Sequence, residues 1–255
     1  MSEDIPLSHK LEQRLNHPCF PQPPNQQLRI WRYMDLAKFV WLLKEKRLFM
    51  SRLDKFADPY EGSLTKKTIE GIDLFLRQHG SKDSWAEMSN MYRENQSSTF
   101  VCCWHGNEQE SEAMWRLYCG SGHGIAIQST YDRLVETIKE QLETYVGCVK
   151  YIDYEREWFP DANAFYPVMH KRSAFAHENE VRLVCSPSSY RLMPLEQRPT
   201  SICIPWDSTT MIERVYVDPY APEYFYNVVQ SIVSAFEPSI SPRLFWSQMK
   251  AAPLF

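Results

Sequence analysis

The sequence predicts an α+β fold: a single mixed-sheet domain with helices packed on the sheet, preceded by an extended N-terminal arm. Short runs rich in β-branched and aromatic residues indicate strands, and apolar residues at helical spacing indicate helices. The two kinds of segment do not alternate regularly enough for a doubly wound sheet. With 255 residues, 44% of them hydrophobic and 14% aromatic, the chain is long enough to bury a sizeable core.

The N-terminal residues are predicted to form an arm. A short helix is expected over residues 4–15, and the Pro-rich segment His17–Gln27 that follows is expected to be extended. We therefore assign residues 1–27 to the arm and residues 28–255 to a single domain.

The first strand of the domain is expected at Leu28–Tyr33, followed by a helix for which Asp35 is a suitable N-cap. A short strand is expected at Leu48–Arg52. The loop Asp54–Gly62 (DKFADPYEG) is rich in turn-forming and acidic residues. Two helices follow, over residues 64–79 and 83–94, with a break at Gly80.

The middle of the chain combines two strands with a short helix. Strands are expected at Thr99–Trp104 and Gly124–Gln128, and Ser111 is placed to cap a helix over Glu112–Tyr118. The aromatic residues gathered here are typical of either a ligand pocket or a hydrophobic core, and the pattern leaves both open.

The second half contains the segment that matters most for function. In the expected strand Glu180–Cys185, Val181 and Leu183 belong in the core, so we expect Glu178, Glu180 and Arg182 on an open face. The other elements expected are a helix over Tyr131–Tyr145, a strand over Gly147–Tyr154, an aromatic loop over Glu155–His170, a helical turn over Lys171–His177, a polar loop over Ser186–Ser201, strands at Ile202–Pro205 and Ile212–Val217, a helix over Pro222–Phe236 and a final segment over Ile240–Ser247.

Composition limits the classes of function. A net charge of −4 does not predict strong non-specific nucleic-acid binding, although a local basic groove leaves a nucleic-acid partner open. The longest apolar run in the strongest helix, Phe39–Leu43, is too short to span a bilayer, so no membrane partner is expected. Seven irregularly spaced Cys residues do not indicate a disulfide framework, and we expect a cytoplasmic protein.

Several fragments occur in a familiar order, among them WRYMD, DPYEG, FVCCW, ESEAMWRLYCG, GIAIQS, GCVKYIDY, KRSAFAHENEVRL, ICIPWD and VYVDPYAPEYF. From about Leu28 to Ser247 this order resembles the bacterial domain-of-unknown-function family twenty-nine seventy-one. The resemblance implies a bacterial protein, and many members of that family look like mobile or defence-associated proteins.

A second resemblance is to ADP-ribosyltransferases, which place an Arg or His on an early strand, a Ser, Thr or Tyr on a middle strand and a Glu on a late strand. Arg32 corresponds to the first, Ser98-Thr99 to the second, and Glu178-Asn179-Glu180 is similar to the Glu-x-Glu pattern. The resemblance implies NAD as substrate, with Glu180 or Glu178 as the catalytic carboxylate and Arg32 on the phosphates or ribose. The residues expected to contact the substrate are Tyr33, Asp58, Glu61, Trp104, Trp115, Tyr118, Lys171, Arg172 and Arg182.

Three alternatives remain open at this point. Cys102, His105, Cys119 and His123 have spacings compatible with a zinc site. Asp58, Glu61, Glu178 and Glu180 are candidates for a magnesium-dependent nuclease site, with Lys171 and Arg172 facing phosphate. The third alternative is a non-catalytic interaction module. The expected partner is accordingly a nucleotide-like small molecule or another protein, and the oligomeric state is left open.

Overall fold

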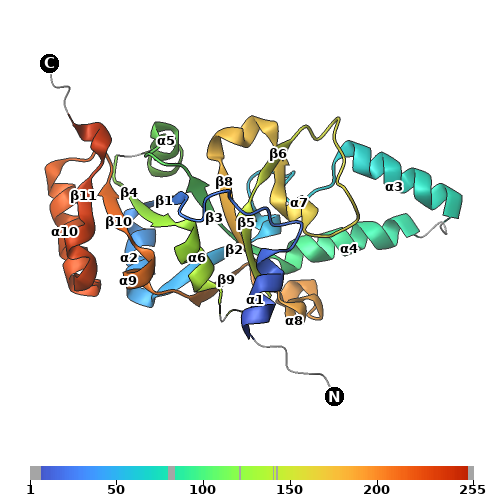
Figure 1. Ribbon diagram of the computed structural model, residues 1–255, viewed down its shortest axis with the longest axis horizontal. Coiled ribbons are helices and arrows are strands. Elements are labelled where there is room, and N and C mark those ends of the chain that lie inside the picture. Colours follow the sequence, from blue (N-terminus) through green and yellow to red (C-terminus); the bar gives the residue numbers. More distant parts are fainter. Residues whose placement is uncertain (1–6, 80–83, 121, 140, 142, 252–255) are drawn as a thin grey trace. The chain divides into compact units, whose positions relative to one another are not determined.

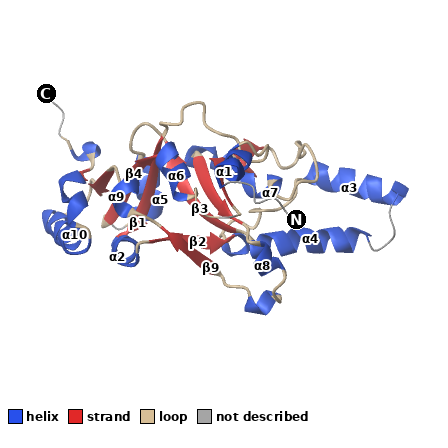
Figure 2. Cartoon of the chain, turned by 60° about the horizontal axis from the view of Figure 1, so that its bottom comes forward, coloured by secondary structure: helices blue, strands red, loops and turns tan. Residues whose placement is uncertain are grey.

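The computed structural model describes residues 7–79, 84–120, 122–139, 141 and 143–251 (Figures 1 and 2). Helices and a mixed sheet are both present, which confirms the predicted α+β class. The chain divides into two units. Unit 1 comprises Met1–Gln22, Met50–Cys102 and Gln141–Ile202, and unit 2 comprises Pro23–Phe49, Cys103–Glu140 and Cys203–Phe255. The predicted division at residues 27 and 28 into an arm and a single domain stays a prediction.

Unit 2 contains β1 (Arg29–Asp35), part of β3 (Phe100–Gly106), β4 (Gly124–Thr130), β10 (Arg214–Val217) and β11 (Leu244–Trp246). Strand β1 pairs antiparallel with β3 and β4, so Trp31 lies opposite His105 on one side and Gln128 on the other. Strand β10 pairs antiparallel with β4 and parallel with β11, which makes this part of the sheet mixed. Its strands carry a largely buried apolar core, including Ile30, Ile125, Ile127, Val215 and Val217.

The helices of unit 2 pack on these strands. Helix α2 (Leu36–Glu45) begins as predicted, because the Asp35 carboxylate accepts a hydrogen bond from the backbone N–H of Lys38 at 2.8 Å. It ends at Lys46, whose φ of 50° stops the helix. The other helical segments are α5 (Glu112–Cys119), α6 (Tyr131–Thr137), α9 (Ser208–Met211), α10 (Glu223–Phe236), η4 (Pro238–Arg243) and η5 (Gln248–Lys250).

Unit 1 contains β5 (Thr144–Cys148) and β8 (Glu180–Cys185), which pair antiparallel, and β8 also pairs with β3. Strands β6 (Lys150–Ile152) and β7 (His170–Arg172) form a separate two-stranded parallel sheet. Strands β2 (Arg47–Arg52) and β9 (Ser201–Pro205), like β3, have residues in both units. The helical segments are α1 (Leu7–Leu15), η1 (Leu53–Lys55), α3 (Lys66–His79), α4 (Ser84–Ser98), α7 (Tyr166–Met169), η2 (Ser173–Glu178), α8 (Ser188–Arg191) and η3 (Leu195–Gln197).

The segment after α1 runs along β5. The backbone N–H of Cys148 donates to the carbonyl of Pro21 at 2.8 Å, and the Gln22 side chain donates to the carbonyl of Val146 at 3.0 Å. A Cβ added at Gly147 would lie 2.8 Å from the Phe20 carbonyl carbon. Glycine therefore lets the two backbones approach closely here. Residues 4–6 of the expected first helix, and the expected break at Gly80, fall outside the described residues.

Several boundaries differ from the sequence prediction, and three of them lie between residues 131 and 178. The helix expected over Tyr131–Tyr145 is wrong in its second half: α6 ends at Thr137, and β5 begins at Thr144 because residues 144–148 pair with β8. The single strand expected over Gly147–Tyr154 is two strands, β5 and β6. In the segment expected to be a helical turn from Lys171, residues 171 and 172 extend β7 before η2 begins. None of the helices in the described ranges is both long and apolar enough to cross a membrane.

Candidate functional site

Five charged side chains converge in the interior of unit 1. Three are carboxylates and two are cations, and we call them the buried charge cluster. Their relative side-chain exposures range from 0% for Arg182 to 11% for Glu178. The members are Glu61 from the turn before α3, Lys171 from β7, Glu178 from the end of η2, and Glu180 and Arg182 from β8; of these elements, α3 and β8 are labelled in Figure 1.

Lys171 contacts all three carboxylates. Its Nζ donates to Glu180 Oε1 at 2.7 Å and to Glu178 Oε2, and it lies 3.2 Å from Glu61 Oε1. An ammonium has three N–H donors, so these three partners match its full donor capacity. The ammonium holds protein carboxylates, and the expected contact of Lys171 with substrate or phosphate stays a prediction.

Arg182 supplies the second cation. Its Nε donates to Glu180 Oε2 at 2.7 Å, its Nη2 to Glu61 Oε1 at 2.9 Å, and its Nη1 to the carbonyl of Val168 at 2.6 Å. Glu180 consequently accepts from Lys171 on one oxygen and from Arg182 on the other. A buried carboxylate with both oxygens bonded to cations is fixed in position and keeps its charge.

A left-handed residue brings the two candidate catalytic carboxylates together. Asn179, with a φ of 38°, ends η2 and separates Glu178 from the first residue of β8, Glu180. Asparagine tolerates this conformation better than most residues. Glu178 therefore lies outside the strand, which corrects the expected alternation.

The expected open face of β8 is also wrong. Every residue of the strand is buried, Arg182 included, because Lys171 and Glu61 cover the charged face. The other face agrees with the prediction, since Val181 and Leu183 lie in the core.

The two carboxylates of the Glu-x-Glu pattern are in opposite electrostatic situations. Burial and the hydrogen bond with Glu180 raise the pKa of Glu178 to about 7. Burial acts in the same direction on Glu180, but Arg182, the hydrogen bond with Glu178 and Lys171 together lower its pKa below the usual range. Burial opposes the charge on Lys171, and Glu180 and Glu61 outweigh it, so the pKa of Lys171 is raised. The pair thus consists of one firmly ionised carboxylate beside one that readily holds a proton.

The cluster reaches the protein surface beside Arg172. Its Nη2 donates to Asp58 Oδ1 at 2.8 Å, and its guanidinium lies 4.3 Å from the Tyr60 ring centroid and 5.3 Å from that of Phe175. The Phe175 ring also lies 4.7 Å from Lys171 Nζ. The side chain of Arg172 is 37% exposed and Tyr60 is 43% exposed. The acidic DPYEG loop therefore contacts two arginines, since Asp58 bonds to Arg172 and Glu61 bonds to Arg182.

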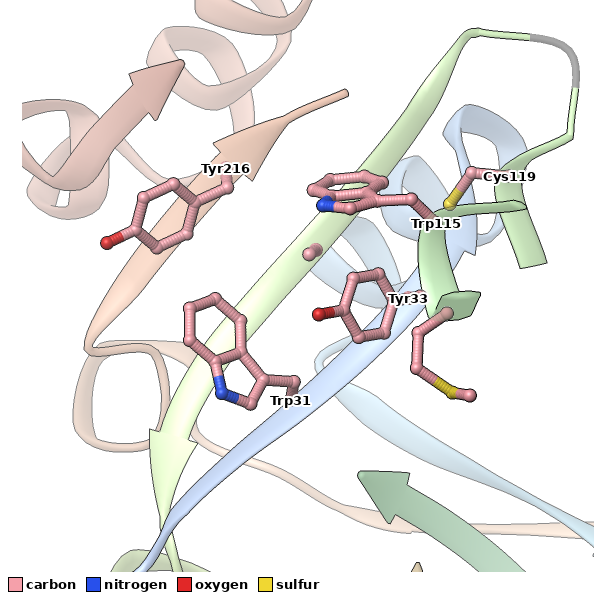
Figure 3. Packing of buried hydrophobic residues seen from close by; sticks show 7 residues of the cluster. Trp31, Tyr33, Trp115, Cys119 and Tyr216 are labelled. Carbon is pink, nitrogen blue, oxygen red and sulfur yellow. The ribbon is translucent and has the colours of Figure 1, made fainter. Parts of the chain in front are cut away.

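Tyr33 and Trp115, two of the aromatic residues expected to contact the substrate, belong to a hydrophobic core in unit 2 (Figure 3). The Tyr33 and Trp115 rings meet edge to face with centroids 5.0 Å apart. The Tyr33 hydroxyl accepts from Ser111 N–H at 2.9 Å, and Trp115 Nε1–H donates to Glu110 at 3.0 Å. The buried members of this cluster are Trp31, Tyr33, Met114, Trp115, Cys119, Ala126 and Tyr216.

The remaining candidates also lie in unit 2. The Arg32 guanidinium is 5.9 Å from the Trp104 ring centroid and donates to the carbonyl of Phe49 at 3.4 Å. Trp104 is buried, whereas Tyr118 is half exposed. Glu180 lies in unit 1. The expected role of Arg32 on the phosphates or ribose stays a prediction.

The two metal hypotheses find no support in the described part of the chain, where no three His, Cys, Asp or Glu side chains form a metal-ligand group. In the buried charge cluster the position between the three carboxylates is taken by the Lys171 ammonium. In the proposed zinc set, Cys119 is buried with its Sγ 3.5 Å from the Met34 carbonyl, and burial raises its pKa to about 12. His123 Nε2 instead lies 3.1 Å from the Tyr224 hydroxyl.

Sequence reasoning missed three aromatic residues around the cluster. The Tyr151 hydroxyl accepts from the Glu180 backbone N–H at 2.8 Å, and Tyr60 and Phe175 flank Arg172. All three lie in fragments that carry the family resemblance, which could have indicated them: Tyr60 in DPYEG, Tyr151 in GCVKYIDY and Phe175 in KRSAFAHENEVRL.

Comparison with known proteins gives one family and several structures. Residues 114–183 match the model of the family described as "Protein of unknown function (DUF2971)", which confirms the sequence resemblance over that range. No curated protein matches the chain. Thermus sp. 2.9 DarT in complex with NAD+ is similar at 10% identity and a TM-score of 0.41, covering 91% of this chain and 100% of that one. The same protein in complex with ADP-ribosylated ssDNA is 9% identical with a TM-score of 0.42, covering 91% and 99%.

Proposed function

We propose that this chain is an ADP-ribosyltransferase-like enzyme that cleaves NAD, with Glu180 as the carboxylate that stabilises the transition state. The observation that carries the proposal is the pairing of Glu178 and Glu180. They lie two residues apart, both contact Lys171, and their pKa values are shifted in opposite directions. Neighbouring titratable groups whose pKa values are shifted in opposite directions are typical of active sites.

The chemistry matches the needs of glycosidic cleavage. The bond between nicotinamide and the ribose C1′ breaks, its electron pair leaves with nicotinamide, and positive charge develops on the ribose. A fixed negative charge stabilises that state, as carboxylates do in glycoside hydrolysis. Glu180 is suited to this role because Lys171 and Arg182 hold both of its oxygens and so fix the position of its negative charge.

Glu178 is suited to a second role in the reaction, the transfer of a proton. Its side chain is the most exposed of the cluster, and its raised pKa lets it accept or release a proton near neutral pH. We therefore propose that Glu178 removes the proton from the acceptor that receives the ADP-ribose. The exposed ring of Tyr60 provides an aromatic face that suits a nucleotide base, and it lies against the guanidinium of Arg172, which is paired with Asp58.

The decisive comparison is wild-type protein against Glu180→Gln, measured as nicotinamide release from NAD. The substitution keeps the size of the side chain and leaves two carboxylates with two cations, so the fold should persist. Removing the charge should reduce release by ~100-fold or more. NAD should still raise the melting temperature of both proteins, because binding precedes the charge development that Glu180 stabilises.

The matched control is Glu155→Gln, which removes an exposed carboxylate paired with Lys66 in the same unit and should leave release unchanged. Failure of the wild-type protein to bind NAD, or to release nicotinamide with any acceptor tried, would overturn the enzyme proposal. The chain would then be better described as a non-catalytic interaction module.

A further inference from the structure

The buried charge cluster contains one carboxylate too many. Glu61, Glu178 and Glu180 contribute three negative charges if all are ionised, and Lys171 and Arg182 contribute two positive charges, which leaves a net charge of −1. An uncompensated charge is strongly disfavoured in a buried site, and carboxyl groups in such a site take up a proton instead. The geometry therefore favours one bound proton in the cluster.

The contacts indicate which carboxylate holds that proton. Glu180 has a cation on each oxygen, and Glu61 contacts both Arg182 and Lys171. Glu178 contacts Lys171 through one oxygen and also hydrogen-bonds to Glu180, a second carboxyl group. The proton is consequently most stable on Glu178, in the hydrogen bond between the two carboxyl groups.

We propose that Lys171 is a positioning residue whose charge keeps Glu180 ionised and confines the single proton of the cluster to Glu178. Its catalytic consequence rests on the proposed function, whereas the protonation state is a property of the free protein. Without the Lys171 ammonium, Glu180 would keep one cation instead of two, and a second carboxyl group would have to take up a proton.

The groups around the cluster do not change this charge count. Tyr151 and Tyr154 stay neutral, because burial raises the pKa of both phenols. The charges of Asp58 and Arg172 cancel in their ion pair, which borders the cluster through Tyr60 and Phe175.

The test measures carboxyl titrations by NMR in protein labelled with ¹³C at the Glu side-chain carboxyl, without NAD. Wild-type protein should show one Glu that titrates near neutral pH, and Glu178→Gln should lose that signal. Lys171→Met should show two Glu residues that titrate near or above neutral pH. Lys171→Arg, which keeps the charge, should show one.

The most discriminating variant is the double substitution Lys171→Met with Glu61→Gln. It removes one cation and one carboxylate, so two carboxylates and one cation remain and a single neutral-pH titration should return. A purely structural role for Lys171 predicts the opposite, since two altered side chains would disturb the cluster more than one. Lys67→Met, at an exposed lysine paired with Glu70, is the control and should leave all Glu titrations unchanged.

The pH profile of nicotinamide release gives the second readout. Lys171→Met should lose at least ~10-fold at pH 7 and recover part of that loss at higher pH, and the double variant should restore the wild-type profile. If all Glu residues of the wild-type protein titrate below pH 5, or if the double variant resembles Lys171→Met, the proposal is overturned. If NAD is not turned over at all, the titrations still decide the role of Lys171, so the two failures can be told apart.

Discussion

The ammonium nitrogen of Lys171 lies 2.7 Å from Oε1 of Glu180, and both side chains are buried. The two residues come from β7 and the start of β8, with η2 and Asn179 between them. A lysine buried at this position can remain charged because carboxylates surround it, and the carboxylates remain ordered because the lysine holds them. The charge cluster is therefore a single electrostatic unit, and changing one member should affect all of them.

Arg182 is the first member to test. Replacing it with Met removes one of two cations and leaves three carboxylates with Lys171 alone. Removing one partner of a buried ion pair leaves the other charge buried without a counter-ion. We therefore expect the free energy of unfolding to fall by about 3–5 kcal/mol. Urea denaturation measures this. Arg156→Met, at a largely exposed arginine 3.7 Å from Asp153, should change stability by less than about 0.5 kcal/mol. Similar losses for the two variants would contradict a coupled cluster.

The raised pKa of Glu178 predicts an unusual pH dependence of stability. Its pKa is about 7 in the folded protein, above that of an unfolded Glu. Between these two values the folded state binds a proton that the unfolded state has released. The stability that this proton contributes is therefore complete below the pKa of Glu178 in the unfolded chain, and it is lost as the pH rises through about 7.

The measurement is the free energy of unfolding of wild type and Glu178→Gln at intervals from pH 5 to pH 8.5. Gln resembles the protonated carboxyl group, so the wild-type value should fall relative to the variant as the pH rises. A difference that stays constant over this range would show that Glu178 is ionised throughout.

Asp58 and Asp73 form a matched pair of carboxylates in unit 1. The Asp58 side chain is 8% exposed and bonds to Arg172, whereas Asp73 forms an exposed helical pair with Arg77. Asp58→Asn should lower stability by about 1–3 kcal/mol, since it removes a charged hydrogen-bond acceptor from a partly buried guanidinium contact. Asp73→Asn should cost less than about 0.5 kcal/mol. Chemical denaturation distinguishes them, and equal effects would indicate that the DPYEG turn is effectively solvated.

Local sequence signals were sufficient for much of the fold. The Asp35 cap and the strand Glu180–Cys185 were predicted correctly, because each depends on neighbouring residues: a side chain over the next backbone N–H groups, and alternation along one strand. The helix over residues 131–145 was predicted too long, since its apolar spacing continues past Thr137. What ends it is pairing of residues 144–148 with β8, a long-range interaction that periodicity does not report.

The same limit applies to the candidate site. Alternation correctly separated Val181 and Leu183 from the charged face, but it assumed that the charged face meets water. Glu61, which helps to cover that face, lies 121 positions from its partner Arg182. Composition also could not assign protonation states, because the shift of the Glu178 pKa arises from burial and from neighbours that the fold brings together.

The last prediction concerns the segment that runs beside β5. A methyl group at Gly147 would lie 2.8 Å from the carbonyl carbon and 2.9 Å from the Cα of Phe20, both backbone atoms that cannot rotate away. Gly147→Ala should therefore push residues 20–22 off β5 and lower the free energy of unfolding by about 1–3 kcal/mol. The loss of the Cys148–Pro21 hydrogen bond should appear as faster amide exchange at Cys148.

Gly71→Ala provides the opposite case in the same unit. Gly71 lies within α3 with no atom near the added Cβ, so alanine should raise stability by about 0.5–1 kcal/mol through its helix propensity. Thermal and urea unfolding of the two variants under identical conditions compares a blocked glycine with an unobstructed one. If Gly147→Ala were as stable as wild type with unchanged exchange at Cys148, the close approach of Phe20 to β5 would not exist in solution. The packing of the segment after α1 would then need to be assigned differently.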